Sequence, residues 1–154
     1  MALVDSDEHD EYGNITESAE VRRKMVEKRA KKFENLKKEV QEPWLIGEKQ
    51  PEHLIVAWGS SYGAVKEAVE TLNSEGVSIG ALVFGDIWPL PTENLGSMYK
   101  TAKNLIAVEQ NSTGQLEGLI RQEMLIKCSH KILKYDGRAF SGEEIYDRLK
   151  GEVV

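Results

Sequence analysis

The chain has 154 residues, of which 40% are hydrophobic and 30% charged, and its formal net charge is −6. These values are typical of one folded domain with an additional segment and exclude a disordered chain. The single cysteine, Cys128, excludes an internal disulfide and a zinc or iron–sulfur site built from the chain's own thiolates. Because no uncharged run reaches the roughly 18 residues of a membrane span and Met1 leads into an acidic segment rather than a signal peptide, we expect a cytoplasmic protein.

The charge is distributed unevenly along the chain. Residues 1–17 carry six acids and no lysine or arginine, residues 18–40 carry a net charge of +5, and residues 41–154 carry a net charge of −5. We therefore predict two parts. An acidic N-terminal segment and a basic linker helix occupy residues 1–43, and a folded α/β domain occupies residues 44–154.

In the acidic segment, Asp5, Asp7, His9 and Glu11 occupy alternate positions, a spacing that invites comparison with a calcium-binding loop. The glycine of an EF-hand would fall elsewhere in this pattern, and no glutamate closes the loop. A solvated or interface-directed loop is therefore favoured over a metal site.

A long charged helix follows, for which Thr16 is a suitable N-cap. Its apolar stripe is narrow and consists of Val21, Met25, Phe33, Leu36 and Val40. A stripe of this width does not hold a helix alone in water, so we expect the helix to pack along another surface. Nucleic-acid binding by its basic face is the weaker alternative, because acids are interspersed and stacking aromatics are lacking. The helix should end before Pro43, since the residue before a proline disfavours the helical region.

Four strand–helix units follow a short edge strand at Trp44–Gly47. In the first strand–helix unit, the apolar strand 54–58 stops at Gly59, and two serines can cap the next helix. That helix buries one stripe, formed by Val65, Ala68, Val69 and Leu72. The later strands are expected at 77–84, 105–108 and 131–135. The later helices begin at Thr92, Ser112 and Ser141, the last two with capping-box patterns.

Strands that alternate with helices predict an α/β fold with a mostly parallel sheet and helices on both faces. Ligands and partners of such sheets meet the crevice at the carboxyl ends of the strands. The candidate interface or weak anion-binding residues follow these strand ends. They are Gly59, Ser60, Ser61, Tyr62, Gly63, Glu109, Gln110, Asn111, Gly114 and Gln115.

The turn 59–63 places hydroxyls and free amides at a helix N-terminus, where an anion could bind. Its spacing matches neither the dinucleotide fingerprint nor the P-loop, so a simple turn or a partner contact is favoured. Glu109 could be a buried catalytic base, but no His or Cys motif lies beside it, and hydrogen bonding at an interface is favoured. The two serines lack the context of a hydrolase nucleophile, and Trp58 and Trp88 are interpreted as packing residues. We expect no catalytic, cofactor-binding or metal-binding residue in this chain.

Read together, these strand-end sequences resemble the C-terminal domain of the α subunit of 2-oxoacid:ferredoxin oxidoreductases. The motifs that carry the resemblance are Trp58-Gly-Ser-Ser-Tyr-Gly63, Trp88-Pro-Leu-Pro91, Val108-Glu-Gln-Asn111 with Gly114-Gln115-Leu116, and Tyr135-Asp-Gly-Arg-Ala-Phe140. The acidic segment with Gly13-Asn-Ile-Thr-Glu17 and the basic helix is similar to the linker of the same subunit. The resemblance extends from about Val4 to Leu149.

The resemblance implies a three-layer α/β/α fold like the transketolase C-terminal domain, with about five strands and one antiparallel edge strand. Trp44–Gly47 is the candidate for that edge strand. The implied parent enzyme is of the 2-oxoglutarate or generic 2-oxoacid type. It uses thiamine diphosphate, Mg²⁺ and an iron–sulfur cluster to convert a 2-oxoacid and CoA into acyl-CoA and CO₂, and it passes electrons to ferredoxin.

In this family the cofactor sites lie in other domains or in the β subunit, so the resemblance implies no cofactor in this chain and no activity of the chain alone. The residues that select the 2-oxoacid are expected outside it, in keeping with a separated domain or a split-gene product. The implied partners are the β subunit and the remaining α-subunit domains, with ferredoxin and CoA at the level of the complex, and neither nucleic acid nor a membrane. The alternative is a free-standing α/β module that binds a small anionic or nucleotide ligand at the strand carboxyl ends.

Overall fold

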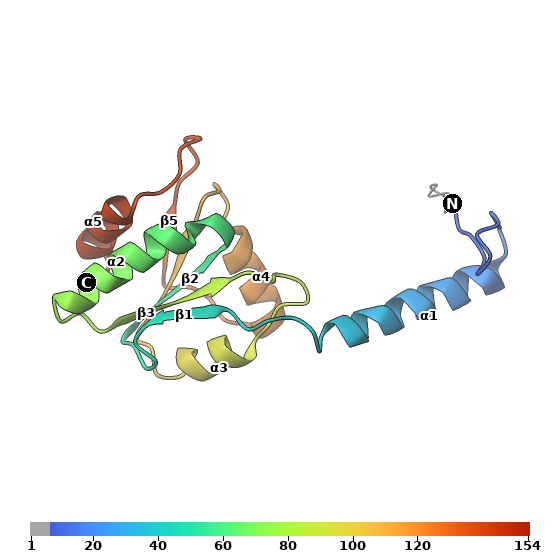
Figure 1. Ribbon diagram of the computed structural model, residues 1–154, viewed down its shortest axis with the longest axis horizontal. Coiled ribbons are helices and arrows are strands. Elements are labelled where there is room, and N and C mark those ends of the chain that lie inside the picture. Colours follow the sequence, from blue (N-terminus) through green and yellow to red (C-terminus); the bar gives the residue numbers. More distant parts are fainter. Residues whose placement is uncertain (1–6) are drawn as a thin grey trace. The chain divides into compact units, whose positions relative to one another are not determined.

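The computed structural model describes residues 7–154, so Asp5 of the alternating acidic pattern lies outside the described part. The chain divides into two units, residues 1–40 and 41–154, each of which we describe by itself. Figure 1 gives the order of the elements. Within the described residues, no helix combines the length and the apolar character that crossing a bilayer requires.

The first unit contains helix α1 (Ala19–Leu36). Its N-cap is Ser18, whose hydroxyl accepts a hydrogen bond from the Val21 N–H at 3.4 Å. The predicted cap at Thr16 is therefore wrong by two residues, because the Thr16 hydroxyl accepts from the N–H of Ser18 instead. The helix also ends at Leu36, earlier than expected, and the chain continues in turns.

The acidic segment folds back on itself and onto α1. The Asp10 carboxylate accepts the backbone N–H groups of Tyr12 and Asn14, each at 2.9 Å. Glu8, whose side chain is 8% exposed, forms ion pairs with Arg29 at 2.7 Å and Arg22 at 3.4 Å. These two acids thus bind groups of the chain itself. Within residues 7–154, no three His, Cys, Asp or Glu side chains are placed to hold a metal ion.

We expect the attachment of this loop to α1 to weaken in acid. The hydrogen bond from Arg29 lowers the pKa of Glu8 from 4.5 to about 2. Because this pKa is lowered by folding, the contribution of the ion pair is fully present above about pH 4.5 and is lost as the pH falls through about 2. Glu8→Gln should remove the same contribution at neutral pH, with faster amide hydrogen exchange over residues 8–16 as the readout.

The matched control is Glu20→Gln, since Glu20 pairs with Lys24 on an exposed helical surface where such pairs contribute little. Unchanged amide exchange in Glu8→Gln, or an equal change in both variants, would contradict the expected role of Glu8.

The second unit is built on a five-stranded sheet with the strand order β1-β3-β2-β4-β5. Strand β1 pairs antiparallel with β3, whereas all the other pairs are parallel. The strands are β1 (Trp44–Gly47), β2 (His53–Trp58), β3 (Ile79–Phe84), β4 (Asn104–Glu109) and β5 (His130–Leu133). The predicted sheet is confirmed, including the antiparallel edge strand.

Helices cover both faces of this sheet (Figure 1). Helices α2 (Tyr62–Ser74) and α5 (Gly142–Glu152) pack on one face, and α3 (Glu93–Tyr99) and α4 (Gln115–Met124) on the other. Alternate residues of each strand enter opposite cores, as side chains of a strand do. Ile55 of β2 lies in the core under α2 and α5, and its neighbour Val56 lies in the core under α3 and α4. The three-layer α/β/α prediction is confirmed.

Several predicted boundaries differ from the structure. Strand β3 begins two residues later than expected and β5 ends two residues earlier, because the flanking residues leave the hydrogen-bonded ladder. The serines after Gly59 do not cap α2 through their side chains. They form a 3₁₀ turn, η1 (Gly59–Ser61), that leads directly into the helix.

Candidate functional site

The carboxyl ends of four neighbouring parallel strands bring the predicted motifs together. Strand β3 ends at Phe84, β2 at Trp58, β4 at Glu109 and β5 at Leu133, and they are neighbours in the order β3-β2-β4-β5. The turns that follow these strands therefore lie along one edge of the sheet. We call this edge, formed by residues 58–63, 85–88, 109–116 and 134–140, the rim.

Gln110 connects the motifs across the rim. Its side-chain N–H lies 3.5 Å from the hydroxyl oxygen of Ser60, in the turn after β2. Its side-chain oxygen accepts the backbone N–H of Phe140, in the loop after β5, at 3.3 Å. Gln110 and Ser60, two candidate residues that lie 50 positions apart in the sequence, are therefore in contact. The structure adds Phe140, which was not among the candidate residues.

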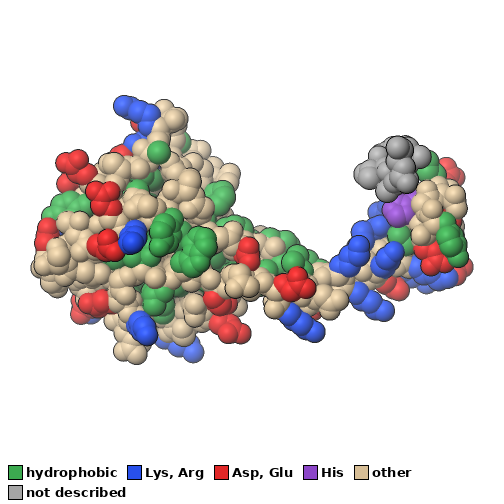
Figure 2. Space-filling model, viewed as in Figure 1, with side chains coloured by type: hydrophobic (Ala, Val, Ile, Leu, Met, Phe, Trp, Pro, Cys, Tyr) green, Lys and Arg blue, Asp and Glu red, His purple; other side chains and the backbone are tan. Residues whose placement is uncertain are grey.

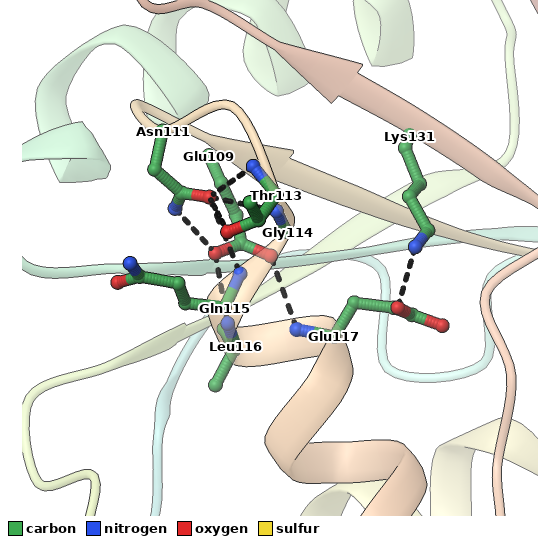
Figure 3. Close-up of polar contacts among 8 residues, drawn as sticks. All are labelled: Glu109, Asn111, Thr113, Gly114, Gln115, Leu116, Glu117 and Lys131. Carbon is green, nitrogen blue, oxygen red and sulfur yellow. Dashed lines mark hydrogen bonds and ion pairs between the residues drawn. The ribbon is translucent and has the colours of Figure 1, made fainter.

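Glu109 lies beneath the rim and has no exposed surface. One carboxylate oxygen accepts the backbone N–H of Leu116 at 2.8 Å and the side-chain amide of Asn111 at 2.9 Å. The other oxygen accepts the backbone N–H of Glu117 at 3.0 Å. Figure 3 shows this arrangement at the start of α4. A carboxylate of the chain itself thus occupies the N-terminus of α4, where the helix dipole and unpaired N–H groups favour negative charge.

The loop before α4 is closed by Asn111. Its side-chain oxygen accepts the N–H of Gly114 at 2.7 Å and that of Thr113 at 3.1 Å. Gly114 is the N-cap, with a φ of +72° and no side chain to donate or accept. The predicted capping box that begins at Ser112 is therefore wrong, since Glu109 and Asn111 supply the cap from the end of β4.

The second predicted capping box is half confirmed. The Ser141 hydroxyl accepts the N–H of Glu144 at 3.1 Å and so caps α5. The Glu144 carboxylate does not return to the cap but pairs with Lys134, whose ammonium also donates to the carbonyl of Ala139 at 3.1 Å. Lys134 thereby fixes the loop that follows β5.

The charged side chains and the thiol near Glu109 are paired or buried within the domain. Lys131 pairs with the buried Glu117 at 2.6 Å, and the other carboxylate oxygen of Glu117 has no hydrogen-bond partner among the described residues. Burial, with a smaller effect of the Glu117 carboxylate, raises the pKa of the Cys128 thiol to about 12. Because the thiolate is the reactive form, Cys128 is inert near neutral pH.

Three hollows adjoin one another along the rim. The first, of about 210 Å³, is lined by Trp58, Gly59, Ser60, Ser61 and Gln110. The second, of about 440 Å³, is lined by Gln110, Lys134, Tyr135, Gly137, Arg138 and Ala139. The third, of about 230 Å³, is mainly apolar and is lined by Trp58, Ile87, Gln115, Leu116 and Leu119. The first and second hollows share Gln110, and the first and third share Trp58, so the three hollows form one connected depression along the rim.

Large aromatic side chains are exposed around these hollows. Tyr135 is 73% exposed, and the others, between 38% and 57% exposed, are Trp44, Trp58, Tyr62 and Trp88. The rings of Trp44 and Tyr62 meet edge to face at 5.6 Å between centroids. Figure 2 shows hydrophobic side chains gathered on the viewed face of this unit. The sequence indicated packing roles for Trp58 and Trp88, which are 39% and 51% exposed. It placed Tyr135 in one of the motifs of the family resemblance.

A comparison with known protein families identifies this domain. Residues 51–145 match the pyruvate:ferredoxin oxidoreductase core domain II. The chain belongs to this family. The match includes the four strands β2 to β5, whose ends form the rim, and all the candidate site residues.

Relatives of the chain agree with this assignment. It is 34% identical over 150 residues to the 2-oxoacid:ferredoxin oxidoreductase subunit alpha of Saccharolobus solfataricus. The aligned residues cover 96% of this chain and 24% of that subunit. The chain thus spans about a quarter of the length of this curated relative. The predicted relationship to the α subunits of 2-oxoacid:ferredoxin oxidoreductases is confirmed.

Solved structures resemble the chain as well. The 2-oxoglutarate:ferredoxin oxidoreductase from Magnetococcus marinus, with 2-oxoglutarate, coenzyme A and succinyl-CoA bound, aligns with 100% of this chain and 27% of its own, at a TM-score of 0.82 and 30% identity. The α chain of a probable 2-oxoacid ferredoxin oxidoreductase from Thermoplasma acidophilum aligns with 71% of this chain and 95% of its own, at a TM-score of 0.50 and 35% identity. A split-gene transketolase, with a TM-score of 0.51 and 16% identity, shares the fold alone.

Proposed function

We propose that this chain is the C-terminal assembly domain of the α subunit of a cytoplasmic 2-oxoacid:ferredoxin oxidoreductase of the 2-oxoglutarate type. The parent complex would convert a 2-oxoacid and CoA into acyl-CoA and CO₂ and transfer electrons to ferredoxin. The partners of this domain would be the β subunit and the remaining domains of the α subunit. Core domain II would hold these parts together without catalysing a step itself.

The observation that carries this proposal is the ring of exposed aromatic side chains around the rim. An exposed apolar patch next to polar groups is typical of a protein–protein contact surface, and Trp and Tyr are enriched in such contacts. Trp44, Trp58, Tyr62, Trp88 and Tyr135 all follow or flank strand ends at this edge of the sheet. The exposed candidate residues of the rim turns would then serve as contact residues, whereas Glu109 is buried and caps α4.

The donor groups of the described residues support placing the cofactors elsewhere in the complex. An iron–sulfur cluster needs several thiolates, and Cys128 is one buried thiol. The cluster would therefore belong to the partner domains, and we propose the same location for thiamine diphosphate and Mg²⁺.

The assembly role can be tested in the complete α subunit with its β subunit. We expect the double variant Trp58→Ala/Tyr135→Ala to weaken α–β association by at least about tenfold, since removing central aromatic contacts typically costs about 2 kcal/mol or more. The measurement is sedimentation velocity over a range of concentrations.

The matched control for the rim variant is Tyr99→Ala. Tyr99 is also exposed but ends α3, the helix that returns to the amino end of β4, away from the rim. Wild-type association of the rim variant would contradict the proposed interface. Equal weakening in the control would point to a general loss of folding instead.

A second candidate function, the binding of a small anionic or nucleotide ligand by a free-standing module, is favoured by one observation. The hollow next to Ser60 and Ser61 lies at the N-terminus of α2, where an anion is stabilised. The exposed aromatics around it favour the assembly role as the main function.

A further inference from the structure

We propose that residues 41–44 form a clasp that fixes the loop between β3 and α3, and that this loop is released when the clasp opens. The loop comprises residues 85–92, and we call it the proline loop. It contributes Ile87 to the apolar hollow and the exposed Trp88 to the rim. The clasp directly follows the N-terminal unit in the chain. Movement of this linker would therefore change the shape of the rim.

Hydrogen bonds join the clasp to the proline loop and to the helix that follows it. The Asp86 carboxylate accepts the backbone N–H of Gln41 at 2.7 Å. The Glu42 carboxylate accepts the backbone N–H groups of Glu93 at 3.2 Å and Asn94 at 2.9 Å. The partners lie 45 to 52 positions apart in the sequence. The loop thus supplies an acceptor to the clasp, and the clasp supplies an acceptor to α3.

Helix α3 depends on this distant carboxylate for its cap. Thr92 is its N-cap residue and makes no capping hydrogen bond with its side chain. The first N–H groups of a helix have no acceptor inside it, and the helix dipole favours a negative charge there. Glu42 supplies both the acceptor and the charge. Pro89 and Pro91 restrict the backbone between Asp86 and Thr92, so a displacement at one end of the loop is transmitted to the other.

The two halves of the clasp are held differently. Trp44 pairs with Val83 in the antiparallel ladder, and a Cβ built at Gly85 would lie 3.5 Å from its ring. This half is therefore anchored in the sheet and packed against the start of the proline loop. The hydrogen bonds of Gln41 and Glu42 to the loop and to α3 are exposed to water. Exposed hydrogen bonds open at a lower free energy than a packed core, so the clasp opens at this half.

This inference goes beyond the assembly role and does not rest on it, because every contact lies within residues 41–154. It is tested on the ¹⁵N-labelled 154-residue chain by amide hydrogen exchange, measured residue by residue with NMR. The experiment needs no β subunit, so its failure is distinguishable from a failure of the interface experiment on the complete α subunit.

Glu42→Ala should accelerate exchange of the Glu93 and Asn94 amides by at least about tenfold, because they lose a charged acceptor. The deciding variant is Asp86→Ala, since the Asp86 carboxylate accepts from neither of these amides. It removes the acceptor of the Gln41 N–H, so the clasp opens and exchange of the Glu93 and Asn94 amides should rise by about threefold or more. The double variant should exceed Glu42→Ala only slightly, because both substitutions open the same contact.

The matched control is Glu143→Ala, because Glu143 is an exposed acid in the first turn of α5 and should leave exchange in α3 unchanged. The buried strand residues Val56 and Leu82 report whether each variant remains folded. If Asp86→Ala loosens these strands, Asp86→Asn, which keeps the side-chain volume, replaces it. Wild-type exchange of the Asn94 amide in a folded Asp86 variant, additive effects in the double variant, or an equal effect of the control would overturn the proposal.

Discussion

Glu109→Ala is expected to destabilise the chain by about 3–5 kcal/mol, because it leaves two buried backbone N–H groups and the Asn111 amide without their acceptor and opens a cavity. For a chain of this size, such a loss lowers the melting temperature by on the order of 10 °C. The measurement is denaturant unfolding followed by circular dichroism.

Glu109→Gln separates the contribution of the hydrogen bonds to stability from the contribution of the side-chain volume. The amide keeps the size and one acceptor but directs an NH₂ donor toward the N–H groups of α4, so we expect an intermediate loss. Glu123→Gln is the matched control, since Glu123 is exposed on the same helix and should change stability by less than about 0.5 kcal/mol. If both Glu109 variants unfolded like the control, the capping role of Glu109 would be refuted.

Gly47→Ala should detach the edge strand β1 and destabilise the chain by about 2–5 kcal/mol. Gly47 has a φ of +75°, which disfavours any residue with a Cβ. A Cβ at this position would lie 2.7 Å from a methyl carbon of Val69 and 2.8 Å from the carbonyl oxygen of Ile79. Backbone conformation and packing therefore act in the same direction, and urea unfolding measures their sum.

Gly118→Ala is the opposite case within the same chain. Gly118 lies in the interior of α4, and nothing approaches the position of its Cβ within 4 Å. Alanine there should stabilise the chain by about 0.5–1 kcal/mol through helix propensity. If both substitutions changed the free energy of unfolding in the same direction, or if the Gly47→Ala variant were as stable as the wild-type chain, Gly47 would not fix the edge strand.

The arrangement of the sheet follows from patterns within short segments. Strand β3 is buried at every position, and the apolar run in the sequence predicts this, because a parallel strand covered on both faces needs apolar side chains throughout. The antiparallel edge strand followed from the shortness of Trp44–Gly47 and from the family resemblance. Boundaries shifted by one or two residues where the chain leaves the hydrogen-bonded ladder.

The helix caps were predicted less well, because the acceptor need not come from the adjoining residues. The cap of α4 comes from Glu109 at the end of β4, whereas the pattern at Ser112 offered a local alternative. The cap of α5 at Ser141 is local and was predicted. A cap can therefore be predicted when its acceptor lies next to the helix and missed when the fold delivers the acceptor from a strand.

The sequence by itself determined the order of strands and helices, the two apolar faces of the sheet and the edge at which candidate residues gather, because these depend on the spacing of apolar side chains along the chain. Only the tertiary structure decided that Glu109 is buried as a cap, that Gln110 joins Ser60 to Phe140, and that the rim aromatics are exposed. The physical reason is that hydrogen-bond partners and exposure depend on distances between strand ends, and sequence separation does not encode those distances.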